Sequence, residues 1–223
     1  MKLNETTPEW ERKFNKLLTD PFLKKKYNRK RRIQEKKDYI NENCSSLKKG
    51  GKFILDIGPG PGEFLELCRK YGNKVSGIDA PPDDCEMGAN YLKLSKLMTE
   101  RQRLSVEYSG FNCKTGFYSE SVDFINSQGA IEQCFYDLLE GPPHRDTHMA
   151  GLLSWKKGPE MHKRFLEMWT EFNRILTPGG NVLIYGNGTA NTDLYDKVVQ
   201  KTAKDCGFEL VWRKSNRFHK WVK

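Results

Sequence analysis

The sequence predicts an α/β fold in which helices cover both faces of a mostly parallel sheet. From Lys52 onward, short apolar runs alternate with segments of helical periodicity, which is the arrangement that produces such a sheet. A glycine-rich turn from Gly58 to Gly62 joins the first apolar run to a helical segment, as in a strand–turn–helix unit. The 223 residues suit one such domain with an appendage.

Two helical segments are expected before this pattern. Thr7-Pro8 and Asp20-Pro21 each have the residues of a helix start, and the second helix should continue to about Asn43. We therefore expect a basic helical extension over residues 1–47 and the α/β domain over residues 48–223.

Strands are expected at the apolar runs, and helices between them. The expected strands are Lys52 to Ile57, Lys74 to Asp79, Leu104 to Ser109, Val122 to Ser127, Asn181 to Tyr185, Glu209 to Arg213 and Phe218 to Val222. The expected helices are about Pro61 to Tyr71, Gly88 to Arg101, Gly129 to Leu139, Pro159 to Leu176 and Thr192 to Cys206. No helix fits between the last two strands, which predicts an antiparallel hairpin.

The stretch from Glu140 to Gly158 interrupts the alternation. It contains Gly141-Pro142-Pro143, ends at Gly158-Pro159, and carries two histidines, His144 and His148. Because long loops inside compact domains are commonly functional, we interpret this stretch as an active-site loop or lid.

Positive charge is concentrated in one segment. Nine Lys or Arg residues and one acid lie between Lys24 and Lys37, so this segment carries eight of the nine net positive charges of the chain. Such a cluster would attract an anionic partner such as RNA, although a solvated helix face explains it equally well.

Two further features of the sequence indicate the location of the protein and the state of its cysteines. No apolar run approaches the roughly 18 residues of a membrane span and no secretory signal begins the chain, so we expect a cytoplasmic protein. The six cysteines lie far apart with no C-x-x-C pair, which favours reduced thiols over a metal site or a disulfide framework.

The glycine-rich turn indicates the kind of ligand. A dinucleotide fingerprint counted from Gly58 would need a third glycine at position 63, where the chain has Glu63. Asp56, two residues before the first glycine, would repel a pyrophosphate but suits the charged amino group of a methionine moiety. The turn therefore favours S-adenosylmethionine over a dinucleotide.

The next expected strand ends in a second acid, Asp79. An acid at this place can accept hydrogen bonds from both ribose hydroxyls of a nucleoside. The alternative is an ordinary connection between strand, helix and strand that binds no ligand.

From Phe53 to the C-terminus the sequence resembles the class I methyltransferases. The similar segments are the glycine motif from Asp56 to Gly62, the ribose-binding acid in Gly77 to Asp79, the fourth-strand motif Val122 to Ser127, and the Pro-Gly-Gly turn within Arg174 to Ile184. The resemblance implies a three-layer, Rossmann-like sheet of seven strands in the order 3-2-1-4-5-7-6, with strand seven antiparallel. It also implies that S-adenosylmethionine lies across the carboxyl ends of the strands.

A set of residues is expected at this cofactor. They are Asp56, Gly58, Pro59, Gly60, Gly62, Asp79, Ala80, Phe111, Asn112, Ser127 and Gln128. Phe111 would cover the purine ring, and Asn112 would accept the hydrogen bond from the adenine amino group, for which the family often uses an acid.

The reaction would be methyl transfer. The sulfonium methyl group is already activated, so the protein has to exclude water and align the acceptor. If the acceptor is a hydroxyl, His144 or His148 is the candidate general base, and Glu132 could bind or deprotonate the acceptor. Each of the three could instead be an ordinary loop or surface residue.

The leading hypothesis is an enzyme that methylates an oxygen or nitrogen of a small molecule or glycan. The alternatives are an RNA methyltransferase that uses the basic helix, and a non-catalytic docking module that retains the fold. A nicotinamide-dependent oxidoreductase is a further alternative, against which the missing third glycine argues.

Overall fold

The computed structural model describes residues 29–60, 62–79, 106–108, 115–131, 150–185, 192–215 and 218–223. The chain divides into two compact units, Met1–Tyr108 and Ser109–Lys223, and each is described by itself. The first expected helix, after Thr7-Pro8, lies outside the described residues, as does the helix expected over Gly88 to Arg101.

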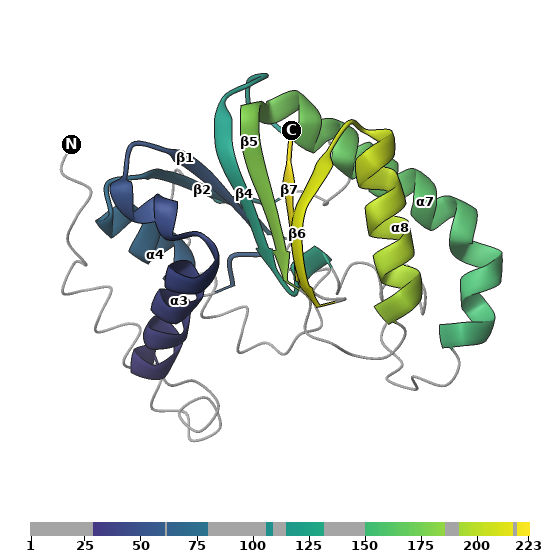
Figure 1. The fold of residues 1–223 in the computed structure, drawn as a ribbon, viewed down its shortest axis with the longest axis horizontal. Helices are drawn as coiled ribbons and strands as arrows, with labels where there is room; N and C mark the ends of the chain where they lie inside the picture. Colours follow the sequence, from purple (N-terminus) through teal and green to yellow (C-terminus); the bar gives the residue numbers. More distant parts are fainter. Residues whose placement is uncertain are drawn as a thin grey trace. The chain divides into compact units, whose positions relative to one another are not determined.

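The first unit contains a parallel three-stranded segment of sheet, β3-β2-β1, with helices α3 and α4 (Figure 1). Its elements are α3 (Arg29–Asn43), the short 3₁₀ helix η1 (Ser45–Lys49), β1 (Phe53–Ile57), α4 (Glu63–Lys70), β2 (Lys74–Asp79) and β3 (Val106–Tyr108). Asp56 of β1 pairs with Gly77 of β2, which in turn pairs with Val106 of β3. These parallel pairings agree with the strand order expected for this part of the chain.

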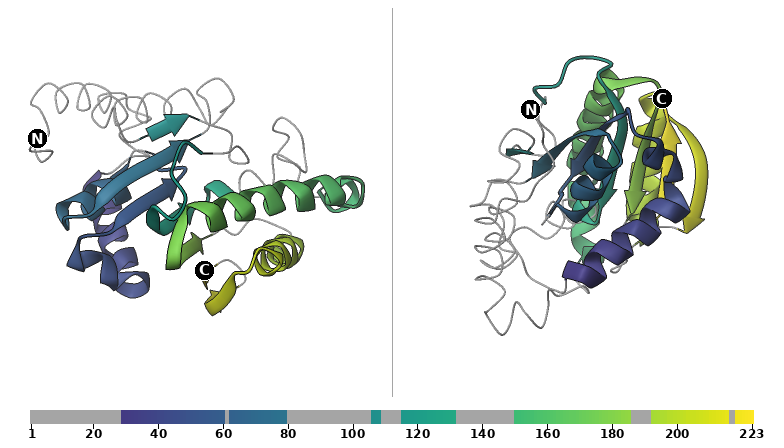
Figure 2. Two further views of the ribbon diagram at one scale, coloured as in Figure 1. Left: turned by 90° about the horizontal axis from the view of Figure 1, so that it is seen from above. Right: turned by 90° about the vertical axis from the view of Figure 1, so that its left-hand side faces the viewer.

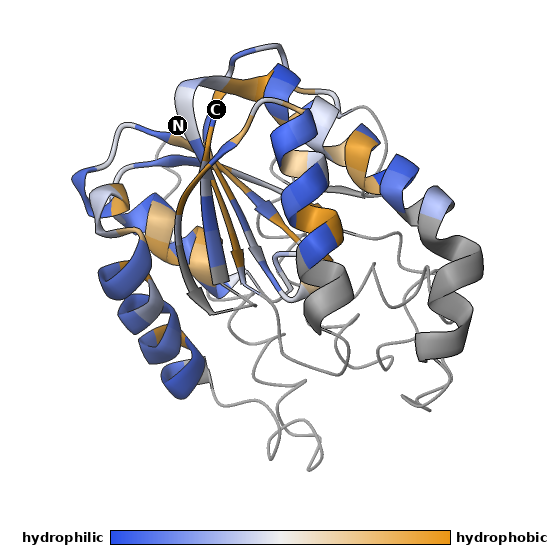
Figure 3. Ribbon diagram, turned by 45° about the vertical axis from the view of Figure 1, so that its right-hand side comes forward, coloured by the Kyte–Doolittle hydropathy of each residue, from blue (hydrophilic) through white to orange (hydrophobic). Residues whose placement is uncertain are grey.

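Helix α3 is the described part of the basic extension, and it ends at Asn43 as expected. It is mostly hydrophilic, whereas α4 carries more hydrophobic residues (Figure 3). Ile40 of α3 is fully buried, and Tyr39 packs its ring edge-on against Phe64 of α4. The apolar residues at the end of α3 therefore attach the helix to α4.

Asn73 joins three elements in the first unit. Its buried amide donates hydrogen bonds to the carbonyl oxygens of Leu47 (2.7 Å) and Cys68 (2.9 Å). Its carbonyl oxygen accepts one from the Lys52 amide at 3.1 Å. The side chain thereby fixes the end of α4 and the start of β1 against η1.

The second unit contains the strands β4-β5-β7-β6 and the helices α7 and α8. Its elements are β4 (Val122–Gln128), α7 (Ala150–Ile175), β5 (Leu176–Tyr185), α8 (Thr192–Asp205), β6 (Glu209–Ser215) and β7 (Phe218–Val222). β4 and β5 are parallel, and β7 is antiparallel to both β5 and β6, as expected. Figure 2 shows α8 lying alongside α7.

The hydrophobic core of the second unit forms around Trp169. Its ring contacts the rings of Phe172, Phe208 and Trp221 at centroid distances of 4.8 to 5.8 Å. All four residues are buried, and they come from α7, the segment before β6, and β7. This cluster fixes α7 on the sheet of this unit.

Two expected boundaries in the second unit are wrong by several residues, whereas the other differences are of one or two residues. Helix α7 begins at Ala150 and contains Pro159, so residues 150–158, expected within a loop, are helical. Ala, Leu, Trp and Lys tolerate a helix well, and the proline removes a single backbone hydrogen bond from a long helix. Strand β5 begins at Leu176 rather than Asn181, because Leu176 pairs with Val122 ahead of the Pro-Gly-Gly turn.

Candidate cofactor site

The glycine-rich turn between β1 and α4 has the backbone conformation that its sequence requires. Gly58, Gly60 and Gly62 have φ angles of 67°, 52° and 84°, in the left-handed region that favours glycine. The Gly58 amide donates to the carbonyl of Ile78 at 2.7 Å, and the Gly62 amide donates to the carbonyl of Pro59 at 2.9 Å. These bonds tie the turn to β2 and close it on itself.

The turn leaves open space at its centre and packs closely at its base. A Cβ atom added at Gly60 would meet no atom within 4 Å, whereas one added at Gly77 of β2 would lie 2.9 Å from Cγ of Pro59. Pro59 is buried. The backbone at Gly60 is therefore accessible to a ligand, and Gly77 is needed so that the turn can lie on β2.

The two predicted acids lie on neighbouring parallel strands. Asp56 is one residue before the end of β1 and its side chain is buried, with 3% exposed. Asp79 is the last residue of β2. Because β1 and β2 are parallel, their carboxyl ends lie at the same edge, where the glycine turn also begins.

An ion pair that was not predicted from the sequence joins α3 to the start of α4, next to the glycine turn. Nε of Arg32 lies 2.8 Å from Oε1 of Glu63, the first residue of α4, and Glu63 is only 2% exposed. The sequence draws attention to Glu63, because it stands where a dinucleotide fingerprint has glycine. Nothing in the sequence identifies Arg32, 31 positions earlier, as its partner.

Lys36, one turn after Arg32, lies on the same side of α3. It is half-buried. Burial lowers the pKa of its ammonium group from the ordinary value, while the nearby carboxylates of Asp56 and Glu63 act in the opposite direction. Part of the basic segment is thus directed at buried carboxylates within the first unit.

Two of the expected cofactor residues lie in the described part of the second unit. Ser127 is fully buried, and its hydroxyl accepts a hydrogen bond from the Ile131 amide at 3.3 Å, so it caps the turn that follows β4. Gln128 is the last residue of β4. Ala80, Phe111, Asn112, Glu132, His144 and His148 lie outside the described residues.

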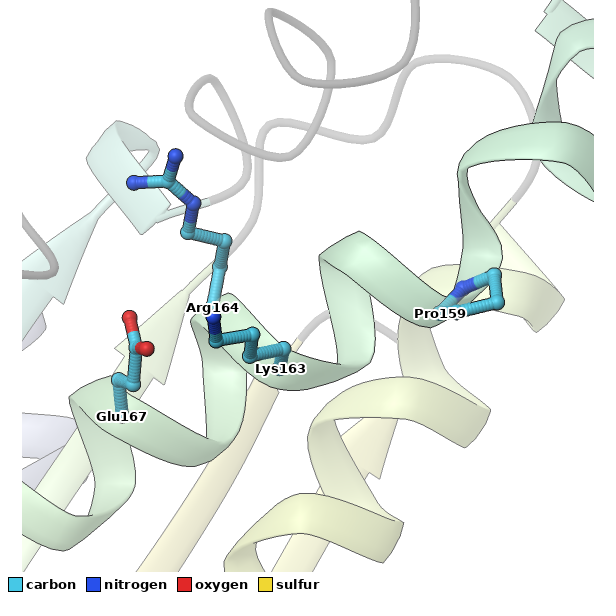
Figure 4. A pocket seen from close by; sticks show the side chains of 4 residues that line it. All are labelled: Pro159, Lys163, Arg164 and Glu167. Carbon is cyan, nitrogen blue, oxygen red and sulfur yellow. The ribbon is translucent and has the colours of Figure 1, made fainter.

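A separate cavity of about 540 Å³ lies against α7 in the second unit (Figure 4). It is lined by Pro159, Lys163, Arg164 and Glu167. None of these residues is among the expected site residues, and all four come from one helix. The cavity therefore does not identify a site by itself.

The described residues were also searched for metal-binding groups, free thiols and membrane-spanning helices. Among them, no group of three or more His, Cys, Asp or Glu side chains could hold a metal ion. Within the same ranges, Cys44, Cys68 and Cys206 are free thiols, and burial raises the pKa of Cys68, which keeps it protonated. No helix in the described part of the chain is long and apolar enough to cross a membrane.

Two curated proteins that are similar to part of this chain in sequence are named as methyltransferases. No protein-family model matches the chain. The chain is 27% identical over 107 residues to a Geobacillus sp. (strain WCH70) protein named as a methyltransferase. It is 28% identical over 95 residues to the ubiquinone biosynthesis O-methyltransferase of Actinobacillus pleuropneumoniae serotype 7 (strain AP76). These matches cover 42% and 43% of this chain, and they span only 40% and 39% of the length of those curated relatives.

Solved structures resemble the chain over most of its length. A SAM-dependent methyltransferase from Aquifex aeolicus has a TM-score of 0.51 at 16% identity, covering 90% of this chain and 95% of that one. Another from Archaeoglobus fulgidus has a TM-score of 0.52 at 18% identity, covering 84% and 73%. At these identities the likeness shows the fold. The chain therefore has the mixed α/β fold of the Rossmann-like, S-adenosylmethionine-dependent methyltransferases.

Proposed function

We propose that this protein is a methyltransferase that uses S-adenosylmethionine. One observation carries the proposal: the glycine turn has three left-handed glycines, starts from a buried acid, and exposes its backbone at Gly60. On a methyltransferase fold, this turn can accept a ligand close to the main chain, where any side chain at position 60 would intrude.

The residues of the first unit fit this cofactor. Backbone groups around Gly60 can approach the ligand directly, and Asp56 offers a carboxylate for the ammonium of its methionine moiety. Asp79, at the end of β2, is proposed to accept hydrogen bonds from the ribose hydroxyls. The cofactor supplies an activated methyl group, so the residues around it have only to hold it, exclude water and align the acceptor.

The ion pair at the start of α4 argues against a dinucleotide. In dinucleotide sites, the start of this helix faces a pyrophosphate. Here the first residue of α4 is Glu63, a buried carboxylate bonded to Arg32. A second anion at this point would be repelled, and Arg32 is already engaged. The site suits a ligand that brings a positive charge.

The proposal extends to the whole chain and to the acceptor. We propose that residues 48–223 form the methyltransferase domain, with the seven-strand order 3-2-1-4-5-7-6 that the resemblance implies. The acceptor is proposed to be an oxygen or nitrogen of a small molecule or glycan, with His144, His148 or Glu132 as the candidate base. A cytoplasmic location is part of the same proposal.

The test is calorimetric titration of the protein with S-adenosylmethionine. Gly60→Ala should weaken binding roughly tenfold or more, because its new methyl group takes up ligand space. Gly51→Ala is the matched control, since Gly51 also has a positive φ and open space but lies outside the turn. Asp79→Ala should also weaken binding. Failure of the unsubstituted protein to bind S-adenosylmethionine would reject the proposed function.

A further inference from the structure

The amino ends of β1 and β2 carry a cluster of cations. Two stretches of the chain, residues 44–52 and 69–74, meet at this edge of the first unit. The Gly51 amide donates to the Gly72 carbonyl at 3.2 Å, and the Lys74 amide donates to the Lys52 carbonyl at 2.9 Å. The two stretches contain no Asp or Glu and six cations, which we call the basic edge: Lys48, Lys49, Lys52, Arg69, Lys70 and Lys74.

The basic edge is fixed in position and open to solvent. Lys48 and Lys49 lie on η1, which the buried side chain of Asn73 holds against the start of β1. Four of the six cations are exposed. One of these, Lys70, lies 3.0 Å from Glu66, which offsets part of the charge. The remaining cations can contact a string of anions at several points.

Two aromatic residues lie among these cations. Phe53 follows Lys52 and Tyr71 follows Lys70, and both aromatic residues are partly exposed. Nζ of Lys74 lies 4.4 Å from the centroid of the Phe53 ring, so an ammonium group and a ring are presented together. Cations interleaved with aromatic rings are typical of surfaces that bind single-stranded nucleic acids, because the cations contact phosphates and the rings stack on bases.

A nucleic acid fits the basic edge better than a membrane does. Binding to a membrane surface commonly adds exposed apolar side chains to the cations, because these side chains enter the lipid. The exposed large hydrophobic residues in the described part of the chain are Tyr118, Tyr185 and Val211, and all three belong to the second unit. In the described part of the first unit, the basic edge is therefore not accompanied by an apolar anchor.

We propose that the basic edge binds a single-stranded nucleic acid, with its lysines at the phosphates and Tyr71 stacked on a base. The edge lies at the amino ends of β1 and β2, whereas the glycine turn follows the carboxyl end of β1. The two ligands would thus bind at opposite ends of these strands. The inference goes beyond the proposed function and does not depend on it.

The experiment measures binding of the full chain to a labelled 20-nucleotide RNA, and to DNA of the same sequence, by fluorescence anisotropy at several salt concentrations. Both affinities should fall steeply with salt, and the tighter ligand identifies the kind of nucleic acid. The triple variant Lys48→Gln, Lys49→Gln, Lys74→Gln should bind roughly tenfold or more weakly. It should also reduce the salt slope by about 2, because each phosphate contact of a single strand contributes about 0.7. Tyr71→Leu should weaken binding roughly fivefold or more without changing this slope.

The matched control removes three exposed cations of α3 instead, in Lys30→Gln, Arg31→Gln, Lys37→Gln. This variant should weaken binding less than about threefold, because it changes the net charge equally but leaves the basic edge intact. Equal weakening by the two triple variants would overturn the proposal. So would unchanged binding in Tyr71→Leu, absence of salt-dependent binding to both nucleic acids, or binding to phosphatidylserine vesicles in place of nucleic acid.

Two further measurements keep the outcome clear. Calorimetry with S-adenosylmethionine on the same preparations reports on the proposed function separately, so the failure of one proposal is distinguishable from the failure of the other. Circular dichroism checks that each variant is folded. If the triple variant at the basic edge is not folded, the single changes Lys48→Gln and Lys49→Gln take its place, since both side chains are exposed, and each should weaken binding about twofold or more.

Discussion

Arg174 and Glu171, one helical turn apart on α7, form a bidentate ion pair. Nε of Arg174 lies 2.7 Å from Oε2 of Glu171, and Nη2 lies 2.6 Å from Oε1. The same guanidinium donates to the carbonyl of Phe117, while Glu171 accepts from the amide and the hydroxyl of Thr115. The pair therefore attaches the segment before β4 to α7.

Replacing Glu171 should destabilise the second unit. Glu171→Gln removes the charge of a buried carboxylate whose partner Arg174 is about one third exposed, and it weakens the bonds to Thr115. We therefore expect a loss of about 1–3 kcal/mol in the free energy of unfolding. Urea denaturation followed by tryptophan fluorescence measures this. Glu35→Gln is the control, because its pair with Arg31 is exposed and should contribute less than about 1 kcal/mol. Equal effects of the two changes would contradict the prediction.

The same pair predicts sensitivity to acid. Burial acts to raise the pKa of Glu171, but hydrogen bonds from Arg174 and Thr115 outweigh it and hold the pKa below its ordinary value. A carboxyl group with a lowered folded-state pKa stabilises the protein above its unfolded-state pKa. That contribution is lost as the pH falls through the folded-state pKa. Unfolding curves between about pH 7 and pH 3 should therefore show a smaller loss of stability in Glu171→Gln than in the unsubstituted protein.

Gly50 and Gly51 should respond differently to alanine. Both have positive φ angles, 71° and 74°, but a Cβ atom at Gly50 would lie 2.5 Å from the carbonyl oxygen of Tyr71, whereas one at Gly51 meets nothing. Gly50→Ala should therefore cost about 1–3 kcal/mol more stability than Gly51→Ala. Thermal unfolding of the two variants makes the comparison, and equal melting temperatures would show that the backbone at Gly50 moves away freely.

Asn73→Ala should lower the free energy of unfolding strongly, although it changes the side-chain volume little. It leaves the buried carbonyls of Leu47 and Cys68 and the amide of Lys52 without their bonds to this side chain. We expect a loss of about 2–4 kcal/mol. Asn181→Ala is the control, because its bond to the carbonyl of Gly179 is exposed and should matter by less than about 1 kcal/mol. Urea denaturation tests both, and a mild effect at Asn73 would mean that water replaces its bonds.

Local patterns predicted most of the strands. The bounds of β2 and β7 agree with the expected ones, because each strand is a short run that contains apolar β-branched or aromatic residues and has clear ends. The conformation at Gly58, Gly60 and Gly62 was predictable for a similar reason, since spaced glycines before a helix are needed only where φ is positive.

Features that depend on residues far apart were not predictable. The start of α7 was placed at Pro159, because a proline after glycine is a strong local signal for a break. From the sequence, Arg32 and Lys36 cannot be told apart from the other cations of the basic segment, because the carboxylates that act on them come from a later segment of the chain. Composition shows that a segment is basic, but only the packing of α3 on α4 shows which cations are turned inward.

The bond between Arg32 and Glu63 has a consequence for the evolution of the chain. Loss of Arg32 alone would take from the buried carboxylate of Glu63 its 2.8 Å bond to the guanidinium, and loss of Glu63 alone would take the same bond from the mostly buried guanidinium of Arg32. Either single change is therefore disfavoured, whereas both together are tolerable. In homologous sequences, positions 32 and 63 should vary as a pair, and a protein with glycine at position 63 should have lost the cation on the preceding helix.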